Sequence, residues 1–227
     1  MDNKIKITHI TRYAKPHTGG IESFIEMFNY CIKDSNTAIN VLCCSNNNKS
    51  DVDKNGVFYD RAKYFFEFAS NTFSVEFLWK LSKVNTDILH YHMPFIFAVV
   101  CHFIARPKYK KLYITYHAEL CGYDKVMKYF WRLYKYFYKI ADRIHILSPN
   151  VIYSDKILTP FKDKCFILPF GISINSDENN FGNRIKNQYK NKKILLCSGR
   201  LVRFKGFQYA IEAMKKVDNA ILLIMGE

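Results

Sequence analysis

Short runs of continuously apolar residues recur along this chain and alternate with longer stretches of helical periodicity. The runs have the length of strands and lack polar alternation, which is typical of strands buried on both faces. We expect strands within residues 4–10, 38–44, 87–92, 112–117, 142–148, 165–170, 193–198 and 220–226. Helices are expected over residues 21–32, 75–84, 95–105, 126–140 and 207–217. The alternation predicts an α/β fold with a doubly wound parallel sheet, in which ligands bind beyond the carboxyl ends of the strands.

The composition of the chain changes after Gly171. Residues 173–191 are polar with little apolar periodicity, and we interpret them as a linker between two domains. The first domain would cover residues 1–172. The second, residues 192–227, would hold one strand, one helix and one strand, about the smallest βαβ unit, and we expect it to be incomplete. The Asn-rich segment 45–56 is expected to be a polar loop.

The composition also narrows the class of protein. The longest uncharged apolar run, residues 93–105, is too short to span a bilayer, and the N-terminus has no apolar signal region. Seven scattered cysteines without a CxxC pattern indicate reduced thiols and a cytoplasmic protein. The net charge of +14 suits a nucleic acid, an anionic membrane or an acidic small ligand, and compositional drift would also explain it. Nucleic acid is not expected as a partner, because the aromatic residues fall mostly at core-like spacing.

Gly19 and Gly20 follow the first predicted strand and directly precede a predicted helix. Glycines at a helix N-terminus let a ligand approach the backbone, and the free N–H groups there favour an anion. A tight turn without any ligand would use the same two residues. The sequence around them has neither the GxGxxG pattern of dinucleotide sites nor a P-loop.

Histidines end two of the predicted strands. His90 and His92 are two residues apart and share a strand face, whereas His117 ends the next strand. Three histidines are able to hold zinc, but no ligand at a fixed spacing accompanies them, and strand-end histidines often only donate hydrogen bonds. We predict that His117 lines a ligand cleft. A DxD-like pair, Asp51 and Asp53, lies in the polar loop rather than after an apolar strand, and we do not expect it to bind a metal.

Two permanent cations, Arg200 and Lys205, lie between a predicted buried strand and the helix that follows it, with Gly199 and Gly206 beside them. Arginine offers a planar fork that binds phosphate through two hydrogen bonds, and lysine offers a compact point charge. At the end of a buried strand, the pair would face a diphosphate. The alternative is two solvated cations in a chain that contains 34 lysines and arginines.

Several segments together resemble the family 4 glycosyltransferases. In order, these segments are HTGGIESF, DILHYHMP, ITYHAEL, ADRIHILSP, ILPFGIS and SGRLVRFKGFQYAIEAM. The resemblance implies the GT-B fold of two Rossmann-like domains, an N-terminal acceptor-side domain and a C-terminal domain that binds the nucleotide sugar. It implies transfer of a hexose from a nucleotide diphosphate sugar to a saccharide or lipid-linked acceptor, with retention at the anomeric carbon and without a metal or cofactor. The first half looks most like the mannosyltransferases of bacterial surface-polysaccharide synthesis.

The resemblance also implies roles for single residues. Arg200 and Lys205 would hold the donor diphosphate and stabilise the charge that grows on it as the sugar leaves. Gly19 and Gly20 would lie against the phosphates or the reacting sugar. His117 would lie beside the donor sugar, near the reaction centre.

On the acceptor side, the resemblance implies roles for Glu22 and Glu119. The chain departs from the family at Phe170–Ser173, where an Asn-Gly-x-Asp pattern is common, and it contains no acidic E-x7-E motif after the last predicted strand. We therefore expect a truncated chain that is inactive alone. A non-catalytic fragment that binds an acceptor or a partner chain is one alternative, and another nucleotide-sugar enzyme such as an epimerase is a second.

The predicted helix near residues 124–143 has a regular distribution of charge. Its cations recur every three or four residues and form one stripe, made of Lys125, Lys128, Arg132, Lys135 and Lys139. A broad apolar face is expected to contain Met127, Phe130, Trp131, Tyr134, Phe137, Tyr138 and Ala141. A core helix with a solvated basic face explains this pattern. A peripheral contact with anionic lipid, on the inner face of the membrane, explains it as well.

Overall fold

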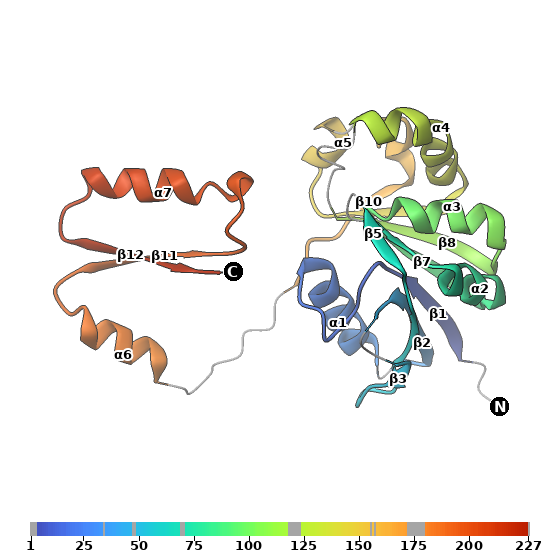
Figure 1. Cartoon of the computed structure of the whole chain (residues 1–227), viewed down its shortest axis with the longest axis horizontal. Helices are drawn as coiled ribbons and strands as arrows, with labels where there is room; N and C mark the ends of the chain where they lie inside the picture. Colours follow the sequence, from blue (N-terminus) through green and yellow to red (C-terminus); the bar gives the residue numbers. More distant parts are fainter. Residues whose placement is uncertain are drawn as a thin grey trace. The chain divides into compact units, whose positions relative to one another are not determined.

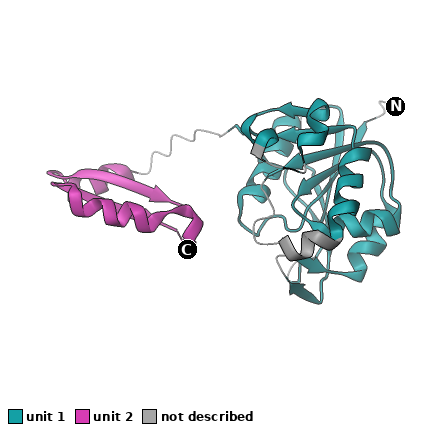
Figure 2. Ribbon diagram, turned by 90° about the horizontal axis from the view of Figure 1, so that it is seen from above, with its two compact units in different colours: residues 1–172 teal, residues 173–227 magenta. Residues whose placement is uncertain are grey.

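The computed structural model describes residues 4–33, 35–46, 49–68, 71–117, 124–154, 156, 158–171 and 180–226, with backbone alone at 124–129 and 154. The chain divides into two compact units, Met1–Ile172 and Ser173–Glu227 (Figure 2). Unit 1 contains the larger sheet, and unit 2 contains a separate pair of strands.

Unit 1 is built on an eight-stranded sheet in the order β10-β9-β8-β7-β1-β2-β4-β3. Every neighbouring pair is parallel except β3 with β4. The strands are β1 (Ile5–Ile10), β2 (Thr37–Cys44), β3 (Asp51–Val52), β4 (Phe58–Ala62), β7 (Asn85–Met93), β8 (Lys108–Tyr116), β9 (Arg143–Ile146) and β10 (Cys165–Ile167). A separate antiparallel pair is formed by β5 (Phe66–Phe68) and β6 (Asn71–Phe73).

Helices cover both faces of this sheet (Figure 1). Helix α1 (Gly20–Ile32) packs on one face, and α2 (Val75–Lys83), α3 (Ile96–Ala105) and α4 (Asp124–Ile140) pack on the other. Two short segments, α5 (Asn150–Ser154) and η1 (Thr159–Lys164), follow β9. The fold is therefore the α/β class with a mostly parallel central sheet that the sequence predicts.

The sequence of β7 shows how one strand serves both faces. Leu89, Tyr91 and Met93 are fully buried in the core that α2, α3 and α4 cover. Side chains along a strand alternate between faces, so His90 and His92 point to the opposite face, where rings of α1 lie against them. The apolar residues therefore hold the sheet to three helices, and the histidines gather beneath α1.

Unit 2 contains the parallel strands β11 (Lys193–Ser198) and β12 (Ala220–Met225). The segments around them are α6 (Phe181–Gln188), η2 (Arg203–Lys205), α7 (Phe207–Ala213) and η3 (Met214–Lys216). Helices α7 and α6 lie on opposite sides of the strand pair (Figure 1). The strand ends approach closely: a Cβ on Gly226 would lie 1.9 Å from the carbonyl oxygen of Gly199, so this contact requires a glycine.

The eight predicted strands and five predicted helices are confirmed, within about two residues at most ends. Two predictions are wrong in part. Helix α6 lies inside the segment 173–191 that we interpreted as a linker, and the expected polar loop 45–56 contains β3. The strands β4, β5 and β6 were not predicted. Within the described part of the chain, no helix is both long enough and apolar enough to cross a membrane.

Unit 1 should lose stability in mild acid, in part through His102. Burial lowers the pKa of His102 from 6.5 to about 4. Between these values the unfolded chain binds a proton that the folded chain does not, so the free energy of unfolding falls as the pH drops through this window. The group's contribution is complete above pH 6.5 and is lost toward pH 4, by at most roughly 3 kcal/mol.

Urea unfolding at several pH values in this window tests the prediction. His102→Gln removes the titrating ring and should flatten the dependence of unfolding free energy on pH, although the variant loses contacts with Tyr91 and Tyr109 at every pH. An unchanged slope in the variant would contradict the assignment.

Candidate functional site

The loop between β1 and α1 is held in place by polar contacts. The Tyr13 hydroxyl donates to Glu67 Oε2 at 2.7 Å, and the ring of His17 stacks on that of Tyr13 with centroids 4.4 Å apart. The Arg12 guanidinium lies 3.6 Å from the other Glu67 oxygen. The chain therefore enters α1 along a fixed path.

Gly19 and Gly20 lie where the sequence predicts, at the N-terminus of α1, and they differ in their surroundings. Gly19 is the N-cap residue, in extended backbone, and a Cβ there would lie 2.3 Å from Glu22 Oε2. A Cβ on Gly20 would meet no atom within 4 Å. A Cβ at position 19 would therefore have to displace the Glu22 carboxylate, whereas position 20 is open space beside the helix N-terminus.

Glu22 fills the space that Gly19 leaves. Its side chain is only 10% exposed, and its Oε1 lies 3.3 Å from His17 Nδ1. A carboxylate in the first turn of a helix is favoured by the exposed N–H groups and the helix dipole. Glu22 is therefore fixed at the helix entrance.

His117 directly follows β8, at the carboxyl edge of the sheet. Its backbone N–H donates to the Met93 carbonyl at 3.1 Å. The rings of Phe24 and Phe170 flank its imidazole, with centroids 5.1 and 5.5 Å away. Burial lowers the pKa of His117 to about 3, so the ring is neutral at neutral pH. Phe24 lies one turn into α1, so the structure brings His117 and the start of α1 to one face of the sheet.

Four more histidines lie on the same face. The register pairs His9 with His90, and Thr115 pairs with both His92 and His145. His9 and His145 were not predicted as site residues, although both lie in predicted strands and the alternation of THI and RIHI could have placed them on this face. Burial lowers the pKa of each of the four strand histidines.

The positions of the strand histidines test whether three of them could hold zinc. Ring nitrogens of His9, His90 and His92 lie within 4.8 Å of one another, whereas the sequence had suggested His90, His92 and His117. Each of the three rings already makes a hydrogen bond, to another histidine or to Thr115. A divalent ion here would have to break these bonds and enter a buried, uncharged site, which is costly.

Asp51 and Asp53 have structural contacts instead of a metal arrangement. Asp51 Oδ1 accepts from Arg61 Nε at 2.9 Å. Asp53 Oδ1 accepts from the backbone N–H groups of Asn55 and Val57, at 2.8 and 3.0 Å. These bonds close the turn between β3 and β4.

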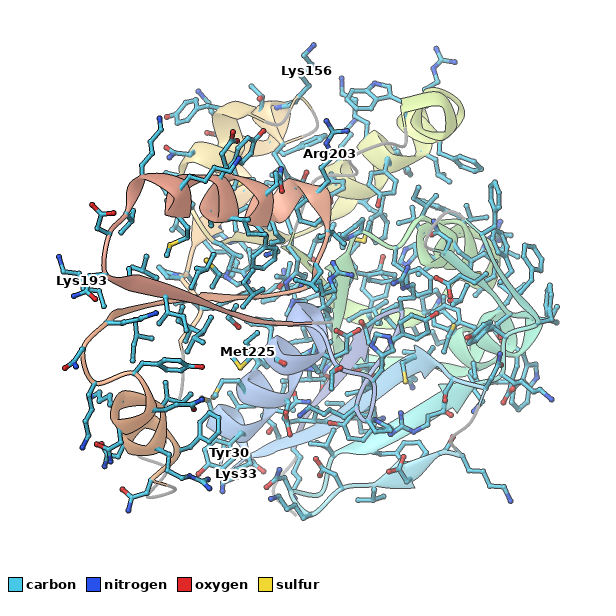
Figure 3. The ribbon with its side chains drawn as sticks, turned by 60° about the vertical axis from the view of Figure 1, so that its left-hand side comes forward. Tyr30, Lys33, Lys156, Lys193, Arg203 and Met225 are labelled. Carbon is cyan, nitrogen blue, oxygen red and sulfur yellow. The ribbon has the colours of Figure 1, made fainter. Side chains whose placement is uncertain are left out.

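Arg200 and Lys205 lie in unit 2, beyond the carboxyl end of β11. The aliphatic stem of Lys205 passes over Gly199, whose missing Cβ would lie 3.9 Å from Lys205 Cδ and Cε. Gly199 has a φ of +143°, a conformation that favours glycine. Arg203 and Met225 mark this end of the strand pair, and Lys193 marks the amino end (Figure 3). Both predicted cations are exposed.

Glu119, predicted on the acceptor side, lies outside the described residues. So do Ile172 and Ser173, the second half of the segment that departs from the family pattern. In unit 1, Gly19, Gly20 and Glu22 lie at the start of α1, whose Phe24 contacts His117. In unit 2, Arg200 and Lys205 lie on either side of the turn that follows β11. What unit 1 offers is neutral imidazole and an open helix N-terminus, whereas unit 2 offers permanent positive charge.

The fold is that of solved glycosyltransferase structures. The HepE protein of Anabaena, solved in complex with UDP, aligns with 98% of this chain and 62% of its own, with a TM-score of 0.66 and 13% identity. A glycosyltransferase of Rickettsia africae aligns with 99% of this chain and 61% of its own, with a TM-score of 0.61 and 16% identity. At these identities, the likeness shows the α/β fold.

Relatives by sequence are glycosyltransferases as well. The O-antigen chain mannosyltransferase C of Escherichia coli is 26% identical over 230 residues, covering 98% of this chain and 61% of that protein. The D-rhamnosyltransferase WbpZ of Pseudomonas aeruginosa is 22% identical over 228 residues, covering 97% of this chain and 59% of that protein. The chain thus spans about three fifths of the length of these relatives. No protein-family model matches it.

The two neighbouring glycines should respond differently to alanine. Gly19→Ala would displace the Glu22 carboxylate from its buried position and should lower the free energy of unfolding by about 1 kcal/mol. Gly20→Ala meets open space in a helical residue and should leave stability unchanged or raise it by up to about 1 kcal/mol. Urea unfolding of both variants decides, and equal losses at both positions would contradict this account.

Proposed function

We propose that this chain has the chemistry of a retaining glycosyltransferase of family 4. It would move a hexose from a nucleotide diphosphate sugar to a saccharide or lipid-linked saccharide, without a metal ion. The observation that carries this proposal is that two relatives, named for mannosyl and rhamnosyl transfer, each match at least 97% of the chain. D-Rhamnose is the 6-deoxy form of D-mannose, which supports a sugar of the mannose type.

The charges of the chain suit the bond that breaks in this reaction. When the anomeric carbon leaves the donor, the bonding electrons go to the diphosphate, whose negative charge grows. Arg200 and Lys205 would bind that diphosphate and stabilise the added charge through hydrogen bonds from permanent cations. The N-terminus of α1 offers further N–H groups to an anion, and Gly20 leaves room for one.

The hydroxyl groups of the sugar are uncharged and suit hydrogen bonds with neutral side chains. His117 is half-buried and uncharged, so it would bind a sugar hydroxyl without competing with Arg200 and Lys205 for the diphosphate. Glu22 and Glu119 would act on the acceptor side.

Labelled donor sugars test the function. The chain is mixed with GDP-mannose or a UDP-hexose and a bacterial membrane extract that contains lipid-linked saccharides. Transfer of label to the extract would support the proposal and would contradict the expectation that this chain is inactive alone. Donor binding without transfer would favour the non-catalytic alternative, and a new epimer formed from the donor alone would favour an epimerase. A chain that neither binds nor converts any donor would contradict the proposal.

Diphosphate binding should depend on particular cations. Arg200→Ala and Lys205→Ala should each weaken GDP or UDP binding by about 1–3 kcal/mol, the scale of a charge-assisted hydrogen bond. Lys192→Ala and Lys216→Ala are matched controls, because both residues are exposed cations that precede a strand. Lys192 directly precedes β11 and Lys216 ends η3, before β12, so neither follows the carboxyl end of a strand as Arg200 does. Equal losses in all four variants, measured by calorimetry, would indicate a diffuse basic surface instead.

A peripheral membrane contact through α4 is part of the proposal. Tyr134, Phe137 and Tyr138 of this helix are buried, as predicted for its core face. Trp131, which the sequence predicts on the same core face, is instead 36% exposed at the surface. It lines an open surface hollow together with Arg132, Lys135, Tyr136, Lys139 and Phe161. Aromatic rings among cations suit the interface of an anionic bilayer, where a lipid-linked acceptor would reside.

Reversing these charges should abolish binding to vesicles. The triple variant Arg132→Glu, Lys135→Glu and Lys139→Glu should not float with anionic liposomes at low salt, because each cation near anionic lipid contributes about 1 kcal/mol. The matched control reverses Lys190, Lys192 and Lys193, exposed cations of unit 2, and should still bind. If the parent chain does not bind anionic vesicles, the membrane contact is wrong and the basic face of α4 is only solvated.

A further inference from the structure

Three histidine rings form a continuous hydrogen-bonded row that leads to His117. His9 Nδ1 lies 2.9 Å from His92 Nε2, and His92 Nδ1 lies 3.0 Å from His117 Nε2. Successive ring centroids are 5.1 and 5.3 Å apart, with an interplanar angle of 32° at each step. His9 and His92 are almost wholly buried, so water does not compete for the bond between them.

The chemistry of imidazole allows this row only two proton arrangements. Burial lowers the pKa of all three rings far enough to keep them neutral at neutral pH, and a neutral imidazole carries one N–H. Each contact between two rings needs one donor and one acceptor. If His92 carries its proton on Nε2, then His9 and His117 must carry theirs on Nε2 as well. If His92 carries it on Nδ1, all three rings are protonated on Nδ1.

The end of the row at His9, opposite His117, is where a neighbouring side chain can favour one of the two proton arrangements. His9 Nε2 is buried, and so are both polar atoms of the Asn29 side chain; within the described part of the chain these three atoms have no hydrogen-bond partner. Asn29 lies close enough to favour the protonated form of His9, as an amide oxygen facing Nε2 would. A small rotation of the amide would pair that oxygen with an Nε2–H of His9.

We infer that Asn29 sets the proton position of His117 through His9 and His92. The amide oxygen of Asn29 holds the proton of His9 on Nε2, and the row then fixes Nε2–H in His92 and His117. The nitrogen that His117 has left over, Nδ1, is consequently a hydrogen-bond acceptor. Asn29, His9 and His92 are positioning residues, and none of them needs to touch a ligand.

This assignment rests on the proposed function for its use. Under that proposal His117 lies beside the donor sugar, and an acceptor at Nδ1 selects a hydroxyl that donates its proton. A ring protonated on Nδ1 would instead present a donor and would suit a different orientation of the same hydroxyl. The row would therefore determine whether His117 accepts or donates the hydrogen bond to the sugar, although most of the row lies in the core of unit 1.

A second polar row on the same face provides an internal control. His90 Nε2 lies 2.7 Å from the Thr115 hydroxyl, which lies 3.1 Å from His145 Nδ1, and His145 Nε2 donates to the Leu168 carbonyl at 2.7 Å. This row does not include His117. A change to His145 therefore perturbs a buried histidine of the same sheet face without entering the row that begins at Asn29.

Nitrogen NMR of the intact, 15N-labelled chain reads the proton positions directly. Long-range proton–nitrogen spectra distinguish a protonated from an unprotonated ring nitrogen, and single histidine substitutions assign the signals. In the parent chain, His9, His92 and His117 should all be Nε2–H. Asn29→Leu, similar in size but without an acceptor, should move the His117 proton to Nδ1. Asn29→Gln, which keeps an amide oxygen, and the control His145→Gln should retain Nε2–H in His117.

Two results would overturn the inference: a parent chain in which any of the three rings carries its proton on Nδ1, or an unchanged His117 in Asn29→Leu. The first needs no variant at the Asn29 position, so it stands even if Asn29→Leu does not fold. Neither readout needs a sugar or turnover. A chain without glycosyl transfer but with a coupled row would contradict only the proposed function, and a transferase with an uncoupled row would contradict only this inference.

Discussion

The parallel pairing of β1, β7 and β8 is the constraint on which the rest of unit 1 depends. It buries the middle of each strand on both faces, so every side chain there must suit one of two environments. On one face Leu89, Tyr91 and Met93 are packed beneath three helices. On the other, the same register places histidines side by side beneath α1. The strand ladder thus creates both the core and the polar row from one alternating sequence.

The polar row is not the arrangement that stability alone would favour. A buried polar group without a partner costs about 1–3 kcal/mol, whereas a hydrogen bond that is made contributes only about 1 kcal/mol net. Apolar side chains at His9 and His92 would avoid the risk and would gain burial energy instead. A fully bonded row does rigidify its surroundings and specifies one arrangement of the rings. Under the proposals above, its value would be in placing His117 rather than in holding the sheet together.

Much of this fold follows from the sequence because the central strands are long, apolar and buried on both faces. The peripheral elements lack that signal. β3 has two residues, β4 reads FYDRA, and α6 has only Phe181 and Ile185 as apolar residues at helical spacing, so their pattern resembles a loop. For the candidate site, the rule that ligands meet the ends of parallel strands predicted His117 and the two glycines, and all three lie where a strand of the sheet ends or the following helix begins. His9 and His145 were missed because a single histidine within an apolar strand gives no sign of its neighbours, which only the register supplies.

The two units share one backbone feature but place different side chains on it. In each, a parallel strand ends at a turn that places a polar side chain at the carboxyl edge of the sheet. In unit 2 the turn needs Gly199, because its φ of +143° is strained for any residue with a side chain, and the strand ends are close enough to require Gly226. Charge on Arg200 and Lys205 costs little because both stay in water. His117 is half-buried, and burial favours its neutral ring. Under the proposed function, the direction of its hydrogen bond would replace charge in binding the sugar.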